Sequence, residues 1–251
     1  VKEYLSQKTF FYNATDATKI PLREKAVKKE KVKKVKRKAG RPKKGEAREA
    51  IKPKILEQQK EMQTVEEMLC LVSTECGVGI KQNSKGNKEV WIGGKLHISA
   101  VDGDIPIIAF YSGANVHDSS VSLPLIQETS KRVNYLYDLQ DAGYDADIIR
   151  EFSTALGHRP IIDINPKNSK ELKVKIEVQK DEQKKFEMLS LVQSSDTHHY
   201  NQRSMVERVN KYLKEDFGCN TIYYQGATKV ASVLAFGILS VCIHQSLKLV
   251  T

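Results

Sequence analysis

Short runs along the chain alternate between apolar and polar residues or are rich in β-branched and aromatic side chains, which predicts β-strands. An Asp-Gly turn at Asp102-Gly103 joins two such runs and is typical of a β-hairpin. Glycines between residues 77 and 86 predict loops. The predicted strands cover residues 8–15, 89–101, 105–113, 133–139 and 159–164.

Other segments place apolar residues at intervals of three and four, which predicts helices over residues 55–72, 118–132, 146–156, 202–216 and 227–248. The most apolar run, Val230–Ile243, is flanked by Lys229 and His244. It is too short to span a membrane and predicts a buried core helix. Residues 166–196 are rich in Lys and Glu and are expected to be irregular or partly helical.

The order of these elements is strand, long insert, hairpin, helix, strand, helix, strand, insert and two helices. A three-stranded meander followed by two strand–helix units predicts an α/β, ribonuclease-H-like fold, a mixed sheet flanked by helices. In that arrangement the first and fourth strands are neighbours at the centre of the sheet. We expect residues 1–18 to hold the first strand and residues 89–251 the rest of the catalytic domain, with a small insertion at 165–199. Between them, residues 19–54 would be a basic flexible insert and 55–88 a helical and loop insert.

Positive charge is concentrated in the first of these inserts. Residues 19–54 contain 17 Lys or Arg and four Asp or Glu, so they carry +13 while the remainder of the chain sums to −3. Such clusters bind polyanions by releasing counterions, which favours nucleic-acid contact over a plain solvated linker. The stretch Ala39-Gly40-Arg41-Pro42-Lys43 resembles the core of an AT-hook, a minor-groove ribbon, in which Arg41 and Lys43 would contact DNA. A plain Lys-rich linker remains the alternative for this stretch.

The four cysteines form no Cys-x-x-Cys pair, and no histidine cluster has zinc-finger spacing. Reduced thiols in a cytoplasmic protein are therefore expected. Residues 1–20 contain no apolar core of the length that a secretory signal needs.

Two aspartates follow predicted strands. Asp16 comes at the end of the first strand and Asp141 just after the fourth. If these strands are neighbours, the two carboxylates converge at one edge of the sheet. Each could instead form a turn or cap a helix, a common role for Asp.

A third acid lies in the helix predicted at residues 202–216. Tyr200, Arg203, Glu207 and Lys214 fall within a stripe roughly 60° wide at ~100° per residue, and Lys211 lies near it. One acid flanked by cations and an aromatic ring is not a core pattern. The alternative is a solvated face held by ion pairs between successive turns.

Two Asp and one Glu can hold two divalent cations about 4 Å apart, as in enzymes that act on phosphodiesters. Hard ions such as magnesium or manganese prefer such oxygen ligands. We therefore expect Asp16, Asp141 and Glu207 to be catalytic, metal-binding residues. Arg203, Lys211 and Lys214 would contact DNA phosphates, and Tyr200 would stack on a base or bond a phosphate.

These residues resemble the DDE transposases of bacterial insertion sequences, and in particular the insertion-sequence-four type with the signature Tyr-x2-Arg-x3-Glu-x6-Lys. Tyr200, Arg203, Glu207 and Lys214 match every spacing. The segments around Asp16 (Asn13–Thr18) and Asp141 (Asp141–Asp145) are also similar to the family's first and second acid regions.

The resemblance implies magnesium or manganese and a reaction in which water nicks the element end and the freed 3′-hydroxyl attacks target DNA. It also implies DNA as partner, a homodimer in a DNA complex, and a bacterial cytoplasmic, nucleoid-associated location without membrane contact. Such enzymes carry an N-terminal DNA-binding domain, and only fifteen residues precede Asp16, which suggests a truncated chain.

Two alternatives stay open: an inactive DNA-binding remnant acting through residues 19–54, and a ribonuclease-H-type nuclease that cuts without joining. Asp145 and Asp163 are spare acids near the expected site. His97 is more typical of packing than of catalysis, and Asp118 is expected to cap a helix.

Overall fold

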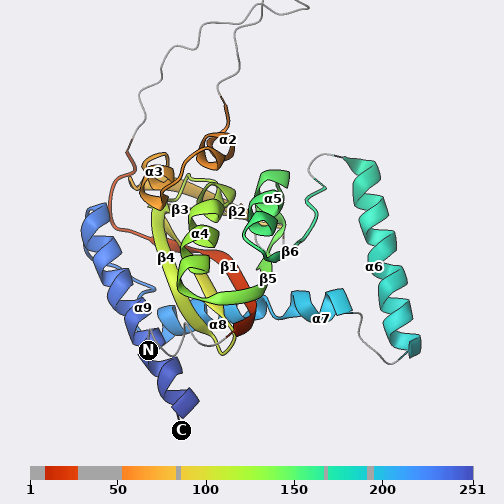
Figure 1. Cartoon of the computed structure of the whole chain (residues 1–251). Coiled ribbons are helices and arrows are strands. Elements are labelled where there is room, and N and C mark those ends of the chain that lie inside the picture. The colour runs from red at the N-terminus through yellow and green to blue at the C-terminus, as the bar shows by residue number, and fades with distance from the viewer. Residues whose placement is uncertain (1–8, 28–52, 83–85, 167–168, 191–194, 251) are drawn as a thin grey trace, which may run out of the picture.

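The protein forms a mixed six-stranded sheet with helices on both faces (Figure 1). A computed structural model describes residues 9–27, 53–82, 86–166, 169–190 and 195–250. The strand order is β2-β3-β1-β5-β6, and β4 pairs with β3. The strands are β1 (Thr9–Pro21), β2 (Gly77–Gln82), β3 (Lys88–Val101), β4 (Ile105–Gly113), β5 (Asn134–Gln140) and β6 (Arg159–Ile162).

The long strand β3 organises the antiparallel part of the sheet. One edge pairs with β1, while on the other edge its first half pairs with β2 and its second half with β4. On the far side of β1 the parallel strands β5 and β6 follow. The first and fourth strands predicted from the sequence, β1 and β5, are therefore neighbours at the centre.

Two sequence predictions about strands are wrong. The strand β1 continues through Asp16 to Pro21 rather than ending at residue 15, because β3 pairs with it as far as Pro21↔Gly93. Residues Gly77–Gln82, predicted as loop, are strand β2 because they pair with the first half of β3. Neither the β1–β3 pairing beyond residue 15 nor the β2–β3 pairing can be recognised from the local residue pattern.

Helices cover both faces of the sheet (Figure 1). The helix α4 (Ser122–Arg132), preceded by the 3-10 turn η1 (Asp118–Val121), packs with α2, α3 and α5 on one face, where Met68, Leu123 and Ile149 are fully buried. On the other face α8 (Ser204–Glu215) buries Met205, Val209 and Leu213 against sheet residues such as Ala14 and Ile98. The remaining short elements are α2 (Ile55–Lys60), α3 (Val65–Cys70), η2 (Ala142–Tyr144), α5 (Asp147–Ala155) and α7 (Ser195–Asn201).

The single helix predicted over residues 55–72 is in fact two, α2 and α3. Thr64 begins α3 as its N-cap, with its hydroxyl accepting from the Glu67 amide and the Glu67 carboxylate accepting from the Thr64 amide. This reciprocal capping box starts a new helix within the apolar periodicity, so the pattern alone does not show the break.

The C-terminal helix α9 (Ala227–Val250) is only partly buried, which corrects the prediction of a buried core helix. Val230, Leu234 and Val241 pack into the core, whereas Phe236, Leu239, Ile243 and Leu247 are exposed. By length and composition alone α9 could also cross a membrane, although 28% of its most apolar window is buried within the fold. Its packing against β4 and α8 makes it part of the globular unit.

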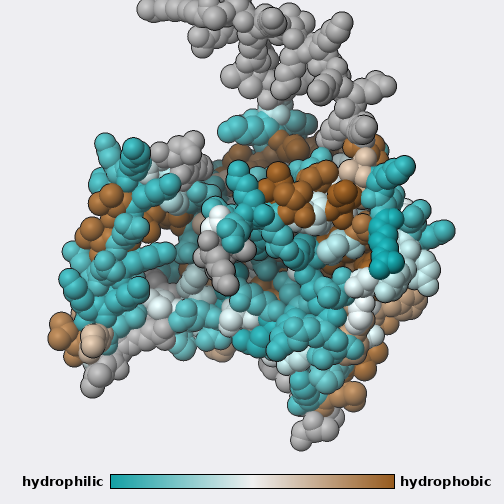
Figure 2. Space-filling view, turned by 180° about the vertical axis from the view of Figure 1, so that it is seen from behind, coloured by the Kyte–Doolittle hydropathy of each residue, from teal (hydrophilic) through white to brown (hydrophobic). Residues whose placement is uncertain are grey.

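The segment predicted to be irregular or partly helical contains the helix α6 (Lys170–Ser190). It buries none of its residues and stands apart from the sheet at the side of β6 (Figure 1), and the surface on that side is mostly hydrophilic (Figure 2). Most of the predicted basic insert, with Arg41, Lys43 and the AT-hook-like stretch, lies outside the described residues.

Candidate active site

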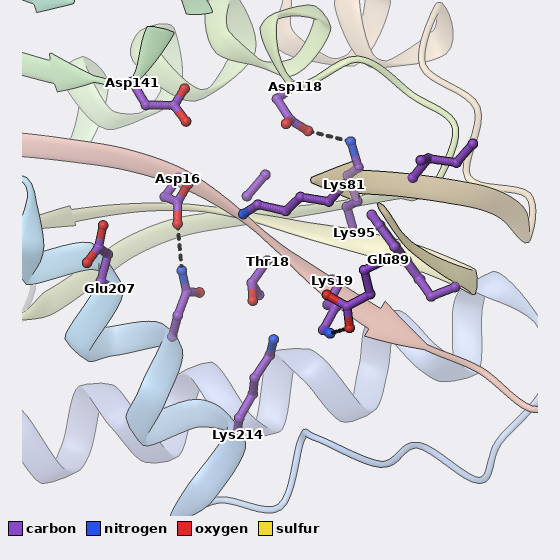
Figure 3. A pocket seen from close by; sticks show the side chains of 14 residues that line it. Asp16, Thr18, Lys19, Lys81, Glu89, Lys95, Asp118, Asp141, Glu207 and Lys214 are labelled. Atoms are coloured by element: carbon purple, nitrogen blue, oxygen red, sulfur yellow. Dashed lines mark hydrogen bonds and ion pairs between the residues drawn. The ribbon is translucent and has the colours of Figure 1, made fainter. Parts of the chain in front are cut away.

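A cavity of about 480 Å³ lies beside the central strands and is walled by β1, β2, β3, the start of η1, the end of β5 and α8. Asp16, Asp141 and Glu207 lie at one end, the acidic end, and the lysines lie toward the other end together with Glu89 and Asp118 (Figure 3). Its lining comprises Asp16, Ala17, Thr18, Lys19, Ile80, Lys81, Glu89, Trp91, Lys95, Asp118, Asp141, Glu207, Asn210 and Lys214.

The parallel ladder between β1 and β5 brings Asp16 and Asp141 to the same edge. Its last pair is Thr15↔Gln140, so the next residue of each strand is one of the two aspartates. β1 continues along β3 past this point, while β5 ends. The predicted convergence thus arises where the parallel pairing stops, not where β1 stops.

Asp16 is partly buried, and its Oδ2 accepts a hydrogen bond from Asn210 Nδ2 at 3.2 Å. Burial, and to a smaller extent the nearby Asp141 carboxylate, raise the pKa of this carboxyl to about 6, against the lowering effects of the Ala17 backbone hydrogen bond, Arg203 and Lys81. A buried carboxyl beside a like charge is an environment that a bound cation would relieve.

Asp141 is the first residue after β5. Its Oδ1 accepts from the Gly143 amide at 2.8 Å and caps the 3-10 turn η2, so the turn-forming role considered from the sequence is also present. A Cβ on Gly143 would come within 2.9 Å of that same oxygen, so the close approach requires glycine. The cap holds one carboxylate oxygen and leaves the other to the cavity.

Glu207 comes from the first turn of α8, whose apolar side packs on the sheet and turns Glu207, Asn210 and Lys214 toward the cavity. The Glu207 side chain is 54% exposed, and its Oε1 pairs with Arg203 Nη2 at 2.6 Å. Figure 3 shows Asp16 between Asp141 and Glu207. As arranged, no three Asp, Glu, His or Cys side chains in the described part of the chain are grouped closely enough to hold a metal ion together.

The residues that the sequence placed along one face of the third-acid helix do not all reach the cavity in the structure. Tyr200 belongs to α7, where Arg203 lies 5.7 Å from its ring and where it lines a second hollow of about 350 Å³ with Asp163. Burial, followed by the Asp163 carboxylate, raises the pKa of Tyr200 to about 12. Lys211 is exposed and pairs with Glu215 at 3.8 Å, outside the cavity.

Most residues that line the cavity were not among the sequence candidates for the site, and they include Lys81, Lys95, Asp118 and Asn210. Asn210 could have been found, since it lies one turn from Glu207 on the same face. Asp118 does not cap the following turn, because His117 takes that position, and it pairs instead with Lys95 at 2.8 Å.

Two other sequence candidates have structural partners. Asp145 holds Arg150 at 2.6 Å and the Asn165 amide at 2.8 Å. His97 is fully buried within the sheet and bonds Ser112, which agrees with packing.

A mixed sheet flanked by helices, with an acid-lined cavity beside its two central parallel strands, is consistent with the ribonuclease-H-like class of fold. A family model described as the transposase DDE domain matches residues 14–243, which is most of the chain. The chain therefore belongs to the DDE transposases, a family that acts on DNA and generally uses divalent metal ions. The comparisons with curated proteins and with solved structures gave no match.

The cavity suits the ions that such a family uses. Its acidic end offers oxygen donors, the carboxylates of Asp16, Asp141 and Glu207 beside the side-chain amide of Asn210, with no sulfur or imidazole among the cavity's lining residues. Hard divalent cations such as magnesium and manganese prefer this donor set.

Proposed function

We propose that this chain cuts DNA at the ends of a mobile element and joins those ends to target DNA, with Asp16, Asp141 and Glu207 as the ligands of two divalent cations, magnesium or manganese. The main support is that these three carboxylates, contributed by β1, the end of β5 and α8, line one cavity in a chain of the DDE family. Bound ions would activate the attacking oxygen and stabilise the leaving one.

The chain's own residues prepare this site. Asp16 must lose its proton to become a ligand, and the Asn210 amide holds its carboxylate in place. Glu207 must exchange its ion pair with Arg203 for the cation. The released guanidinium would then be free to bind a DNA phosphate in bidentate fashion.

The finer family assignment, the insertion-sequence-four type, is also a proposal. It is supported by the spacing of Tyr200, Arg203, Glu207 and Lys214. Lys214 lines the cavity and is proposed to contact a phosphate. Tyr200 lies beyond Arg203, so we propose that it contacts a DNA base or phosphate at the edge of the site. For the exposed Lys211, and for Arg41 and Lys43, we propose only nonspecific contact with phosphates.

The division of the chain is a further part of the proposal. The basic segment would be an arm inserted into the catalytic domain after β1, and α6 would belong to a small insertion before the Glu207 helix. We also propose that the protein acts as a homodimer in a DNA complex. Its proposed location is cytoplasmic and nucleoid-associated, without membrane contact. Light scattering on the protein–DNA complex measures the number of chains and tests the dimer.

The central experiment incubates the protein with a supercoiled plasmid carrying the DNA that flanks this coding sequence, with magnesium or manganese. Asp16→Ala, Asp141→Ala and Glu207→Gln should each reduce strand cutting more than about a hundredfold, because each removes several kcal/mol of metal-mediated stabilisation. DNA binding should survive. Glu215→Gln, an exposed acid on the same helix, is the matched control and should cut normally.

Two other functions predict different results. A ribonuclease-H-type nuclease would cut but would not join pre-cut ends bearing a free 3′-hydroxyl to a second DNA. A DNA-binding remnant would bind DNA in a salt-dependent way and would show no metal-dependent cutting at all. Retention of full cutting by the three acid variants would refute the proposed ligands.

A further inference from the structure

The lysines of the cavity differ in whether they are already neutralised. Lys19 pairs with Glu89, and Lys95 pairs with Asp118 at 2.8 Å. Within the described residues, Lys81 and Lys214 have no ion-pair partner. The two unpaired ammonium groups thus line the same cavity as the carboxylates of the acidic end.

The position of Lys81 follows from strand pairing. In the β2–β3 ladder Gly79 lies opposite Trp91 and Lys81 lies opposite Glu89, so these four residues share one face of the ribbon. The Trp91 indole lies over Gly79, where a Cβ would come within 2.3 Å of the ring, and its Nε1 donates to the Gly94 carbonyl at 3.3 Å. This packing fixes the ribbon beside the cavity.

From that ribbon Lys81 reaches across the cavity toward Asp16 (Figure 3). Its charge acts on groups on several walls: it lowers the pKa of Asp16, of Glu89 and of Lys214. Lys214 is half-buried, and its pKa is lowered first by burial and then by Lys19 and Lys81. Three ammonium groups therefore repel one another around one space, an arrangement that a bound anion stabilises.

We propose that Lys81 and Lys214, flanked by Lys19, form a phosphate-binding subsite that holds the backbone of the DNA strand entering the cavity beside the acidic end. This inference deepens the proposed function and rests on it, because DNA is the phosphate-bearing substrate. Lys81 comes from β2, a strand far in sequence from the third-acid region. In this subsite the lysines would bind the phosphate, and the carboxylates beside it would stay available for the cations.

The chain offers a local reporter for this subsite. Trp91 is the only tryptophan in the sequence, and it lines the cavity. Its fluorescence should change when a single-stranded oligothymidylate is added in EDTA, where no cutting occurs. Lys81→Met should remove most of that change and weaken binding, with a salt slope lower by about one unit for the lost phosphate contact. Lys81→Arg should restore both.

Two matched variants sharpen the test. Lys88→Met removes a lysine from the same ribbon, opposite Gln82 and outside the cavity, and should behave like the unaltered protein. Glu89→Gln removes a negative charge from the cavity wall and releases Lys19, so it should tighten binding severalfold. All of these side chains are exposed, so melting temperatures should change little.

Equal behaviour of Lys81→Met and Lys88→Met, or no change in Trp91 fluorescence with DNA that the protein binds, would overturn the subsite. Failure of the proposed function looks different. In that case the unaltered protein with magnesium would leave the plasmid uncut, while the fluorescence and salt-slope differences between the two lysine variants would persist.

Discussion

Asn13 and Asp138 lie directly opposite each other in the parallel β1–β5 ladder, with Asn13 Nδ2 donating to Asp138 Oδ1 at 3.2 Å. Both side chains are fully buried. They are 125 positions apart, the same offset that separates Asp16 from Asp141. The polar pair therefore favours the register that brings the two candidate metal ligands together, because a slip by one residue would break this hydrogen bond and leave Asn13 Nδ2 and Asp138 Oδ1 buried without it.

Removing the amide should weaken this part of the sheet. In the unaltered protein the Ser99 hydroxyl donates to Asn13 Oδ1 at 2.6 Å. Asn13→Ala removes this acceptor and leaves Asp138 with its hydrogen bond from Ser153. We expect the free energy of unfolding, measured with urea, to fall by about 2–4 kcal/mol. Phe11→Ala on the same strand, where the ring is 65% exposed, is the control and should cost far less. A loss at Asn13 no larger than at Phe11 would contradict the role of the pair.

The same pair predicts how stability depends on pH. Burial raises the pKa of Asp138 to about 6, against the hydrogen bonds from Ser153 and Asn13, while the unfolded value is about 3.9. Between these values Asp138 holds more protons in the folded protein than in the unfolded chain. This group therefore makes the free energy of unfolding fall as pH rises from about 4 to about 6, and its effect then levels off.

Asp138→Asn should make that fall shallower, since it removes one of the titrating groups, whereas Asp16 contributes with the same sign and remains. Urea denaturation at a series of pH values measures the slope. A variant whose slope equals that of the unaltered protein would show that Asp138 does not titrate in this range.

Cation binding should depend on the proton at Asp16, whose pKa is raised to about 6 by burial and by Asp141. A divalent ion binds the ionised carboxylate, so the apparent affinity for manganese should increase with pH up to about 6 and change little above. Calorimetry in two buffers of different ionisation enthalpy should detect proton release below that pH. Asp16→Asn should abolish the dependence, and chelation by EDTA should stop cutting.

Arg203 links the third acid to the first, since it pairs with Glu207 and its charge lowers the pKa of Asp16. Arg203→Met should move the midpoint of the manganese affinity curve to higher pH, because Asp16 loses a stabilising charge. Arg203→Lys should largely preserve the midpoint. Arg208→Met, which breaks a pair with Asp104 on the other side of α8, is the control and should leave the midpoint unchanged. An unchanged midpoint in Arg203→Met would argue against this coupling between Arg203 and Asp16.

Local patterns were enough for much of the architecture. The β-hairpin of β3 and β4, the neighbouring positions of β1 and β5, and the shared face of Glu207 and Lys214 follow from strand alternation, turn residues and the 3.6-residue helical period. These features depend on residues close in sequence, or on the small number of ways in which strands and helices connect.

Features that depend on pairing between distant segments could be seen only in the folded structure. The continuation of β1 through Asp16, the strand at Gly77–Gln82 and the separation of Tyr200 and Lys211 from the cavity have no local signature. The same holds for Lys81, which enters the site only because β2 pairs with β3 and Trp91 packs over Gly79. Residue types and their local spacing were enough to identify side chains that could carry the chemistry. Which of them meet depends on long-range hydrogen bonding and burial, because those contacts are selected by the whole sheet and not by any one strand.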